Sequence, residues 1–497
     1  MQNLFVDTRK LDEAVRASYG LTEEIMMENA AVALSRAVRE FDGWKQRKKR
    51  VLILCGGGDN GADGYALARH IRIDFDVVIF QCVPPKSHLC ITQCSRAEKC
   101  GSRIFDIEDF RLEFLEDAGI VVDCIFGSGF HGNLDKNIQC LLNDVNDVDT
   151  YRIACDVPSG LRSDGTVADG CYKAHKTVTM GALKLSMFSD EAKDLVGEIF
   201  CANLGVERRL FENSTNGNLK VGYLLDKTDM ILPFRKRNCV NKGSFGHVAV
   251  AFGEKSGAAL IAGSAALRFG AGLVTLVDLT DEKPDFSRVP PELICATSFP
   301  KNVTAVAFGM GLGRTDHQIE PYFKYLQENP EVACVIDADV CYSPLLPEFL
   351  QKRQKRVVLT PHPKEFAALL KNCGFGEFTT SECIEKKTEL IEKFCRKYPK
   401  CVLLVKGANT MIGYYNNAGY GRYDFYVNPF GGPALAKAGS GDVLSGLICA
   451  LLAQDYSAID AAVSASIAHA LAGISTGNNY AMTPLDLIQR LTELKAE

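Results

Sequence analysis

The sequence has no excess of basic residues, no long hydrophobic run and no basic N-terminal segment leading into an apolar core. Its 497 residues include 56 Lys and Arg against 61 Asp and Glu, which gives a net charge of −5. Bulk charge therefore offers no attraction to nucleic acid or to an anionic membrane. The longest apolar helical stretch is far shorter than the roughly 20 residues that a membrane span needs. We expect a cytoplasmic protein with neither a nucleic acid nor a membrane as a partner.

Paired Cys-x-x-Cys spacing is also missing, although the chain has 19 cysteines. The densest group, Cys82, Cys90, Cys94 and Cys100, does not have the spacing of a zinc site. Because the cysteines are spread along a long chain, we interpret them as reduced thiols of the core. A hydrophobic content of 47% and a charged content of 24% are those of a globular protein. The length predicts about two to four domains, each large enough to bury its own core.

The most informative segment is Gly-Ser-Gly-Asp at residues 439–442, at the head of an apolar helical run over residues 443–448. Backbone N–H groups and the helix dipole at such an N-terminus attract phosphate oxygens, and glycine lets the backbone approach them closely. Asp442 is then placed to take a proton from a substrate hydroxyl. The tetrapeptide alone favours the plainer interpretation of a glycine turn with Asp442 as a capping charge.

The residues before this segment favour the phosphoryl-transfer interpretation. An apolar strand at residues 401–405 is followed by Lys406 and Gly407, a loop suited to the adenine-nucleotide side of a site. Residues 428–438 are rich in Gly and Pro and predict an irregular loop around a ligand. The order of strand, Lys-Gly loop, Gly/Pro loop and helix resembles the ribokinase-like superfamily.

Further motifs narrow this resemblance. They are Asn-Lys-Gly-Ser-Phe-Gly-His at 241–247, Ser-Gly-Ala-Ala-Leu at 256–260, Phe-Gly-Met-Gly-Leu-Gly at 308–313, Val-Ile-Asp-Ala-Asp at 335–339 and Thr-Pro-His-Pro-Lys-Glu at 360–365. Each has a plain structural explanation as a turn or a cap, but their order resembles the ADP- or ATP-dependent NAD(P)H-hydrate dehydratases from residue 223 to the end.

That resemblance implies a set of site residues. Substrate would be bound by Ala258, Gly311, His362 and Asp442, and the nucleotide by Lys406, Gly407, Ala408, Asn409, Thr410 and Gly441, with Mg²⁺ as cofactor. It also implies that bacterial-type members use ADP and release AMP. The residues themselves do not separate ADP from ATP.

The N-terminal half has its own glycine-rich motif. An apolar strand at residues 51–55 leads into Gly-Gly-Gly-Asp-Asn-Gly-Ala-Asp-Gly at 56–64, and a helical pattern follows from Tyr65. A glycine-rich strand-to-helix connection is where a doubly wound sheet binds phosphate or nucleotide. We therefore predict a loop over this stretch and a Rossmann-like domain around it.

Two further strand ends carry polar residues, Asp123 in the first, and Asp156 and Ser159 in the second. Because neighbouring parallel strands end at one crevice, these residues and Asn60 are expected to meet there. Hard oxygen donors of this kind suit an alkali or alkaline-earth cation. The alternative is that Asp123 and Asp156 only cap loops.

These three strand ends resemble the NAD(P)H-hydrate epimerases over residues 1 to about 215. The resemblance implies that Asn60, Asp123 and Ser159 bind K⁺ and that Asp156 is catalytic. The hydrated dinucleotide would contact Asp59, Asn60, Gly61, Ala62, Asp63, Gly127, Ser128, Gly129, Phe130, His131, Gly132, Asn133 and Asp156. Asp59 and Ala62 depart from the usual Asn and Gly, so we expect an added negative charge at the first and a restricted φ at the second.

Together these observations predict an α/β chain with a Rossmann-like doubly wound domain at residues 1–215 and a ribokinase-like domain at 223–497, joined by a polar junction at 211–218. The expected activities are epimerisation of hydrated NADH and NADPH (NADHX and NADPHX) and ADP-dependent dehydration of the S form. We also expect a homo-oligomer, with helix 460–471 offering a small-residue packing face. The alternative is a kinase for a vitamin precursor with a non-catalytic N-terminal binding module.

Overall fold

The computed structural model describes residues 1–215, 217–279, 285–287, 289–353, 356–416, 422–474 and 478–495. The chain divides into two compact units. Residues 3–221 form the N-terminal unit, and residues 222–497 together with residues 1–2 form the C-terminal unit. Residue 216 of the predicted junction lies outside the described residues, and the first residues of that junction belong to helix α7 (Arg208–Asn213). None of the described helices is both long and apolar enough to cross a membrane.

The N-terminal unit is built on a seven-stranded parallel sheet in the order β4-β3-β2-β5-β6-β7-β9. The chain starts at the centre, runs to one edge and returns to the other side, which is the doubly wound arrangement that the sequence predicts. The strands are β2 (Arg50–Cys55), β3 (Asp76–Gln81), β4 (Arg103–Asp106), β5 (Ile120–Cys124), β6 (Tyr151–Cys155), β7 (Lys176–Met180) and β9 (Glu198–Ala202). Outside this seven-stranded sheet, β1 (Gln2–Phe5) pairs in parallel with β8 (Leu183–Lys184).

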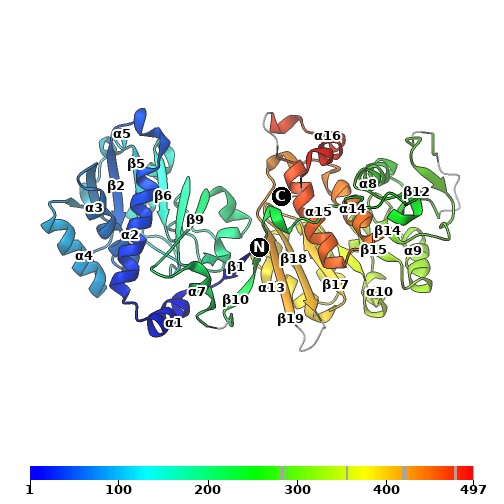
Figure 1. Ribbon diagram of the computed structural model, residues 1–497, viewed down its shortest axis with the longest axis horizontal. Coiled ribbons are helices and arrows are strands. Elements are labelled where there is room, and N and C mark those ends of the chain that lie inside the picture. The colour runs from blue at the N-terminus through cyan, green and yellow to red at the C-terminus, as the bar shows by residue number, and fades with distance from the viewer. Residues whose placement is uncertain are drawn as a thin grey trace. The chain divides into compact units, whose positions relative to one another are not determined.

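Helices cover both faces of this sheet (Figure 1). Val51 and Ile53 of β2 face one apolar cluster, and the alternate residues Leu52 and Leu54 face the other. This alternation follows from the pleat, and burial on both sides explains the continuous apolar run in the sequence. The helices are α1 (Arg9–Tyr19), α2 (Glu23–Arg39), α3 (Asp59–Ile71), α4 (His88–Lys99), α5 (Glu113–Glu116), α6 (Lys136–Asp147) and α7.

The prediction of a loop up to Gly64 is wrong, because α3 already begins at Asp59. Its glycines allow the helix to lie directly on the sheet. A Cβ on Gly61 would stand 1.9 Å from the Gly56 carbonyl oxygen, and one on Gly64 would stand 2.7 Å from the Cys55 sulfur. Glycine here serves close helix-to-strand packing rather than loop flexibility. Ala62 lies in regular helix, so it bears none of the φ restriction that we expected.

The sheet of the C-terminal unit runs in the order β13-β12-β11-β14-β15-β16-β17-β18-β19-β10. The strands from β13 to β17 are parallel, and β18 adds antiparallel pairs with β17 and β19. Their bounds are β10 (Lys220–Leu224), β11 (His247–Ala251), β12 (Leu273–Val277), β13 (Ile294–Ala296), β14 (Ala305–Phe308), β15 (Ala333–Ile336), β16 (Val357–Leu359), β17 (Cys401–Val405), β18 (Thr410–Asn416) and β19 (Arg422–Asn428).

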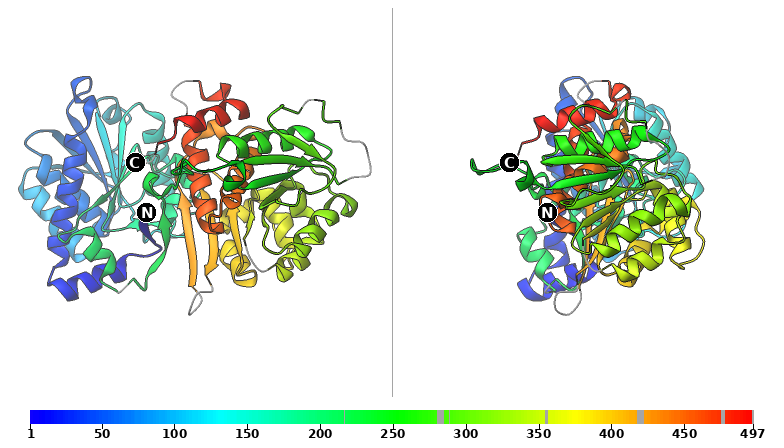
Figure 2. Two further views of the ribbon diagram at one scale, coloured as in Figure 1. Left: turned by 45° about the vertical axis from the view of Figure 1, so that its right-hand side comes forward. Right: turned by 90° about the vertical axis from the view of Figure 1, so that its right-hand side faces the viewer.

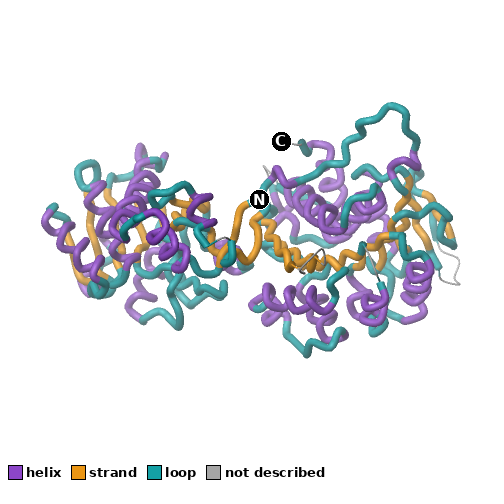
Figure 3. The backbone as a smooth tube through the Cα atoms, turned by 60° about the horizontal axis from the view of Figure 1, so that its bottom comes forward, coloured by secondary structure: helices purple, strands orange, loops and turns teal. Residues whose placement is uncertain are grey.

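Helices lie on both faces of this sheet as well (Figures 2 and 3). They are α8 (Ser256–Arg268), α9 (Asp316–Glu328), α10 (Leu346–Lys352), α11 (Pro363–Asn372), α12 (Thr380–Glu385), α13 (Lys387–Lys397), α14 (Ser440–Ala453), α15 (Ala458–Ala472) and α16 (Pro484–Arg490). The core joins α8, α14 and α15 to the sheet, and small residues permit close contact: a Cβ on Gly446 would lie 2.2 Å from the Ala262 carbonyl oxygen.

Candidate active sites

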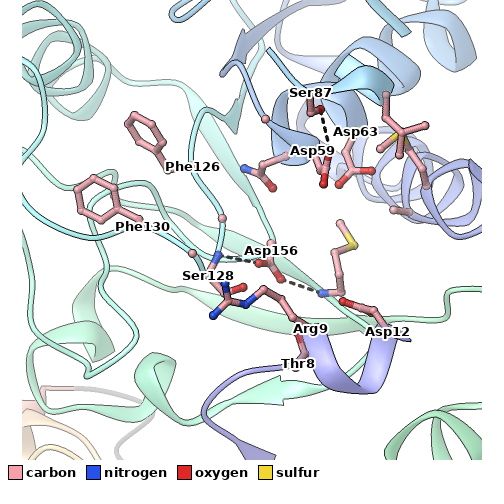
Figure 4. A pocket seen from close by; sticks show the side chains of 18 of the residues that line it. Thr8, Arg9, Asp12, Asp59, Asp63, Ser87, Phe126, Ser128, Phe130 and Asp156 are labelled. Atoms are coloured by element: carbon pink, nitrogen blue, oxygen red, sulfur yellow. Dashed lines mark hydrogen bonds between the residues drawn. The ribbon is translucent and has the colours of Figure 1, made fainter. Parts of the chain in front are cut away.

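The N-terminal unit contains a cavity of about 960 Å³. It opens where β2 and β5, neighbours at the point where the strand order reverses, reach their carboxyl ends. Ligands of doubly wound sheets bind at this position. Figure 4 shows Asp59 and Asp63 of α3, together with Asp156, among the side chains that line the cavity.

Asp123 and Ser159 form a buried pair beneath the cavity. The Ser159 hydroxyl and backbone N–H each donate to the Asp123 carboxylate at 2.7 Å, and the Ile125 N–H donates at 3.1 Å. Burial raises the pKa of Asp123 to about 6, although the donated hydrogen bonds oppose the rise. Asn60 lines the cavity nearby, and its amide nitrogen is buried without a hydrogen-bond partner.

Asp156 follows β6 directly and adopts a φ of +67°. One carboxylate oxygen accepts from the Lys184 ammonium at 2.5 Å, and the other accepts from the Ser128 N–H at 2.9 Å. Burial alone raises the pKa of Asp156, but Lys184 and the hydrogen bonds outweigh it, so that the net pKa is lowered. The structure thus holds an ionised carboxylate at the cavity wall.

Most of the residues that the sequence predicts for this site line the cavity. They are Asp59, Asn60, Asp63, Gly127, Ser128, Gly129, Phe130, His131, Asn133 and Asp156. Gly61 and Ala62 are buried inside α3, and Gly132 is exposed outside the lining. The Asp59 carboxylate accepts a 2.7 Å hydrogen bond from the hydroxyl of Ser87, the residue before α4. This hydrogen bond partly compensates the added negative charge.

In the C-terminal unit, Asp442 lies in the first turn of α14. Gly439 precedes the helix with a φ of +90°, a left-handed conformation that favours glycine. Lys406, which follows β17, lies beside this helix start. Its ammonium would stand 3.1 Å from a Cβ placed on Gly441. The predicted helix start and the lysine of the Lys-Gly loop therefore lie together.

Two carboxylates contact this lysine, and a third, Asp442, is close enough to be influenced by its charge. Its ammonium is 2.8 Å from Asp337 and 3.8 Å from Glu365, and Asp337 also accepts a 2.7 Å hydrogen bond from Ser445. Burial, reinforced by Asp337 and Glu365, raises the pKa of Asp442 to about 6 against the opposing effect of Lys406. Asp442 accepts no side-chain hydrogen bond from the described residues. A carboxyl with this pKa is suited to act as a base near neutral pH.

The other predicted residues of this half lie in three places. His362 caps α11 through its Nδ1 atom and approaches Glu365 with Nε2 at 3.1 Å. Residues 406–409 form the turn between β17 and β18, with Gly407 and Ala408 exposed, Asn409 buried and Thr410 opening β18. Ala258 and Gly311 lie together, because a Cβ on Gly311 would stand 3.3 Å from the Ala258 Cβ, and the glycine loop that carries Gly311 also contacts Asp337, whose carbonyl oxygen would stand 1.9 Å from a Cβ on Gly309.

His469 is buried on α15, and its Nε2 atom lies 2.9 Å from the Ser440 carbonyl oxygen. Burial lowers the pKa of His469 to about 4, so the ring is neutral and donates to that oxygen. It supports the turn before Asp442 from outside the site. The interpretation of this histidine as packed rather than catalytic agrees with its burial.

Sequence reasoning missed Lys184, Asp12 and Glu365. Lys184 follows Asp156 by 28 residues on a two-residue strand, which gives no pattern of its own. Asp12 looks like an ordinary charge on an amphipathic helix. The only available signal was for Glu365, which closes the Thr-Pro-His-Pro-Lys-Glu motif.

Two models of protein families match the chain. The family described as NAD(P)H-hydrate dehydratase matches residues 248–493, and the family described as YjeF-related protein N-terminus matches residues 23–186. Among solved structures, the ADP/ATP-dependent NAD(P)H-hydrate dehydratase of Bacillus subtilis, co-crystallised with ATP and Mg²⁺, is 23% identical with a TM-score of 0.44. That match covers 54% of this chain and 94% of that chain.

Curated relatives match nearly the whole chain. The bifunctional NAD(P)H-hydrate repair enzyme of Helicobacter pylori is 41% identical over 494 residues, which are 99% of this chain and 100% of the relative. The enzyme of the same name from Coxiella burnetii is 31% identical over 97% of each chain. The chain therefore belongs to the family of bifunctional NAD(P)H-hydrate repair enzymes.

Proposed function

We propose that this chain repairs hydrated NADH and NADPH. Residues 1–215 interconvert the R and S forms, and residues 223–497 dehydrate the S form with ADP, releasing AMP and phosphate. The observation that carries the proposal is Asp442, a half-buried carboxyl with a raised pKa that stands at a glycine-lined helix N-terminus beside Lys406. The full-length relatives support the pairing of the two activities.

The dehydration would proceed through a phosphate ester. Asp442 takes the proton of the substrate hydroxyl as that oxygen attacks the terminal phosphorus of ADP, and AMP leaves. The backbone N–H groups at Gly439–Gly441 and the Lys406 ammonium neutralise charge on the moving phosphoryl group. The ester C–O bond then breaks, phosphate leaves with the electron pair, and loss of the neighbouring proton restores the C5–C6 double bond.

Mg²⁺ fits the carboxylates of this site. Asp337 and Glu365 contact a single ammonium and Asp442 lies within its electrostatic influence, so hard oxygen donors with net negative charge gather beside the helix start that would bind phosphate. When bound, Mg²⁺ supplies charge neutralisation at the phosphates. The chain itself positions the other groups: Ser445 donates a hydrogen bond to Asp337, and Asp337 in turn holds the Lys406 ammonium.

The N-terminal unit contains oxygen donors that fit K⁺. Asp123 is a fully buried carboxylate without an ion-pair partner among the described residues, and Asn60, whose amide oxygen can coordinate a cation, lines the cavity nearby. A cation held by Asn60, Asp123 and Ser159 would compensate that buried charge. It would also fix the loop that presents Ser128 to Asp156.

The direct test supplies the purified chain with chemically hydrated NADH, first with ADP and then with ATP. Recovery of the reduced-nicotinamide absorbance with stoichiometric AMP and phosphate is expected with ADP. A parallel incubation with a vitamin precursor and ATP tests the kinase alternative, which the full-length relatives do not favour and which accumulation of a stable phosphate ester would support. Light scattering of the same sample checks the expected homo-oligomer.

We expect dehydration to decline as the pH falls below about 6. Asp442 must be ionised to accept a proton, and its raised pKa of about 6 means that acid removes the active form sooner than for an ordinary aspartate. The measurement is kcat against pH with saturating S substrate and ADP. A rate that stays level down to pH 4.5 would contradict the role of Asp442 as base.

KCl is expected to raise the melting temperature relative to choline chloride at the same ionic strength. A ligand present at about 100 times its Kd stabilises a protein by about 2.7 kcal/mol. Asp123→Asn should remove the difference, since the amide lacks the charge that the cation compensates. Equal melting temperatures in the two salts, or an undiminished KCl effect in Asp123→Asn, would speak against the cation site.

A further inference from the structure

We propose that Asp12 is a second catalytic residue of the epimerase site, protonating the departing hydroxyl of the hydrated nicotinamide while Asp156 accepts the proton of the entering water. The inference rests on the proposed epimerase function and deepens it. An inversion that proceeds by loss and return of water needs an acid on one face of the ring and a base on the other. Asp156 alone supplies only one of these groups.

Asp12 is placed by the first helix of the chain. Leu11 and Val15 are fully buried and fix α1 against the core, and Asp12 lines the same cavity as Asp156. Figure 4 shows the Asp12 carboxylate, carried by α1, and the Asp156 carboxylate as two separate groups at the same cavity, so that a ring edge inserted between them would present one face to each. Within the part of the chain that the structure describes, the Asp12 side chain has no hydrogen-bond or ion-pair partner. Its oxygens are therefore available to a ligand.

The surroundings of Asp12 and Asp156 shift the pKa values of the two carboxyls in opposite directions. Burial raises the pKa of Asp12 to about 6, Lys184 and Arg16 oppose the rise, and Asp156 and Asp7 add to it. Asp156, which is paired with Lys184, has a lowered pKa instead. Two carboxyls in one cavity with pKa values pushed apart are the usual arrangement of a general acid and a general base.

Asp63 is the competing candidate, because it faces the same cavity from α3. Its complete burial, together with Asp156 and Asp59, raises its pKa well above the ordinary value. A carboxyl held protonated so firmly releases its proton poorly near neutral pH. Asp63 also has the Cys155 thiol as a partner at 3.8 Å, whereas Asp12 faces the cavity unpartnered.

The step is balanced within the site. Asp12 gives its proton to the hydroxyl oxygen at C6, the C6–O bond breaks with its electron pair on oxygen, and the ring nitrogen lone pair forms a C6–N1 double bond. Water then forms a C6–O bond on the opposite face, the double-bond pair returns to nitrogen, and Asp156 takes the water proton. In the reverse direction the two carboxyls exchange roles, and solvent restores the starting protonation.

The test follows conversion of the purified R form of hydrated NADH to the S form by the full chain without ADP, separated by chromatography and corrected for the reaction without enzyme. Asp12→Asn should lower kcat by about 100-fold with little change in KM. The wild-type rate should fall as the pH rises above about 6, and this decline should be absent in Asp12→Asn. Asp12→Glu should recover part of the rate. Glu40→Gln, an exposed carboxylate at the end of α2, is the matched control.

Thermal unfolding of the full chain serves as the folding reference for the N-terminal unit, and it should be unchanged in every variant, as should dehydration of the S form with ADP, which belongs to the C-terminal unit. A rate for Asp12→Asn within twofold of wild type, or the same decline with pH in that variant, would overturn the inference. If Asp12→Asn also loses dehydration, Asp12→Glu takes its place in the test. Partial epimerisation that declines as the pH rises supports the role of Asp12, and epimerisation without that decline contradicts it. A wild-type chain that does not accelerate the interconversion at all would refute the epimerase function itself, whereas loss confined to the variant supports Asp12.

Discussion

Asp442→Asn is expected to lower the rate of ADP-dependent dehydration by about 10²–10⁴-fold, the usual contribution of a positioned base. Asparagine keeps the size of the side chain but cannot take the hydroxyl proton. Asp442 has no hydrogen-bond partner among the described side chains, so little structure depends on it. The measurement is recovery of reduced nicotinamide from the S form at saturating ADP.

The same variant should epimerise at the wild-type rate, because the cavity with Asp156 lies wholly within the N-terminal unit. Asp455→Asn is a matched control: it makes the same exchange just beyond the end of α14, at an exposed residue whose φ of +69° asparagine tolerates. Loss of both activities in Asp442→Asn, or an unchanged dehydration rate, would show that the two sites are not independent or that Asp442 is not the base.

The predicted fold class is confirmed, and the reason lies in local patterns. The apolar runs at residues 51–55 and 401–405 are buried strands, and the helix after Gly439 starts where the dipole argument requires it. Each of these signals is carried by fewer than about 10 consecutive residues, so the sequence displays it directly. The start of α3 was misplaced because glycine packed against a strand looks like glycine in a loop.

The partners of the candidate catalytic groups could not be predicted in this way. Lys406 meets Asp337 across 69 residues, and Lys184 meets Asp156 across 28. Such pairs depend on strand order and register rather than on a local period. The sequence therefore indicated which carboxylates end strands, but not which cations hold them ionised.

Lys184→Met should destabilise the N-terminal unit by about 3–5 kcal/mol, the usual cost of leaving one member of a buried ion pair alone. Lys184 is 1% exposed and also donates to Thr179 and to the Met180 carbonyl oxygen. In the wild type the lowered pKa of Asp156 contributes stability above the unfolded-state pKa, and that stability is lost as the pH falls. In the variant, burial is no longer opposed by the lysine, so the pKa rises and stability should instead fall as the pH rises. Calorimetry of the full chain at several pH values measures both effects.

The double variant Asp156→Asn, Lys184→Met separates structure from chemistry. Both charges of the pair are removed, and asparagine tolerates the φ of +67° at position 156, so we expect a melting temperature above that of either single variant. Epimerisation should remain lost, because position 156 no longer carries a carboxylate to accept the proton of the entering water. Recovered stability without recovered activity would assign Lys184 the role of holding Asp156 ionised. Recovered activity would mean that the proton is carried by another group of the cavity. Stability no higher than that of the single variants would show that the lysine supports the fold through its contacts with Thr179 and Met180 rather than through the ion pair.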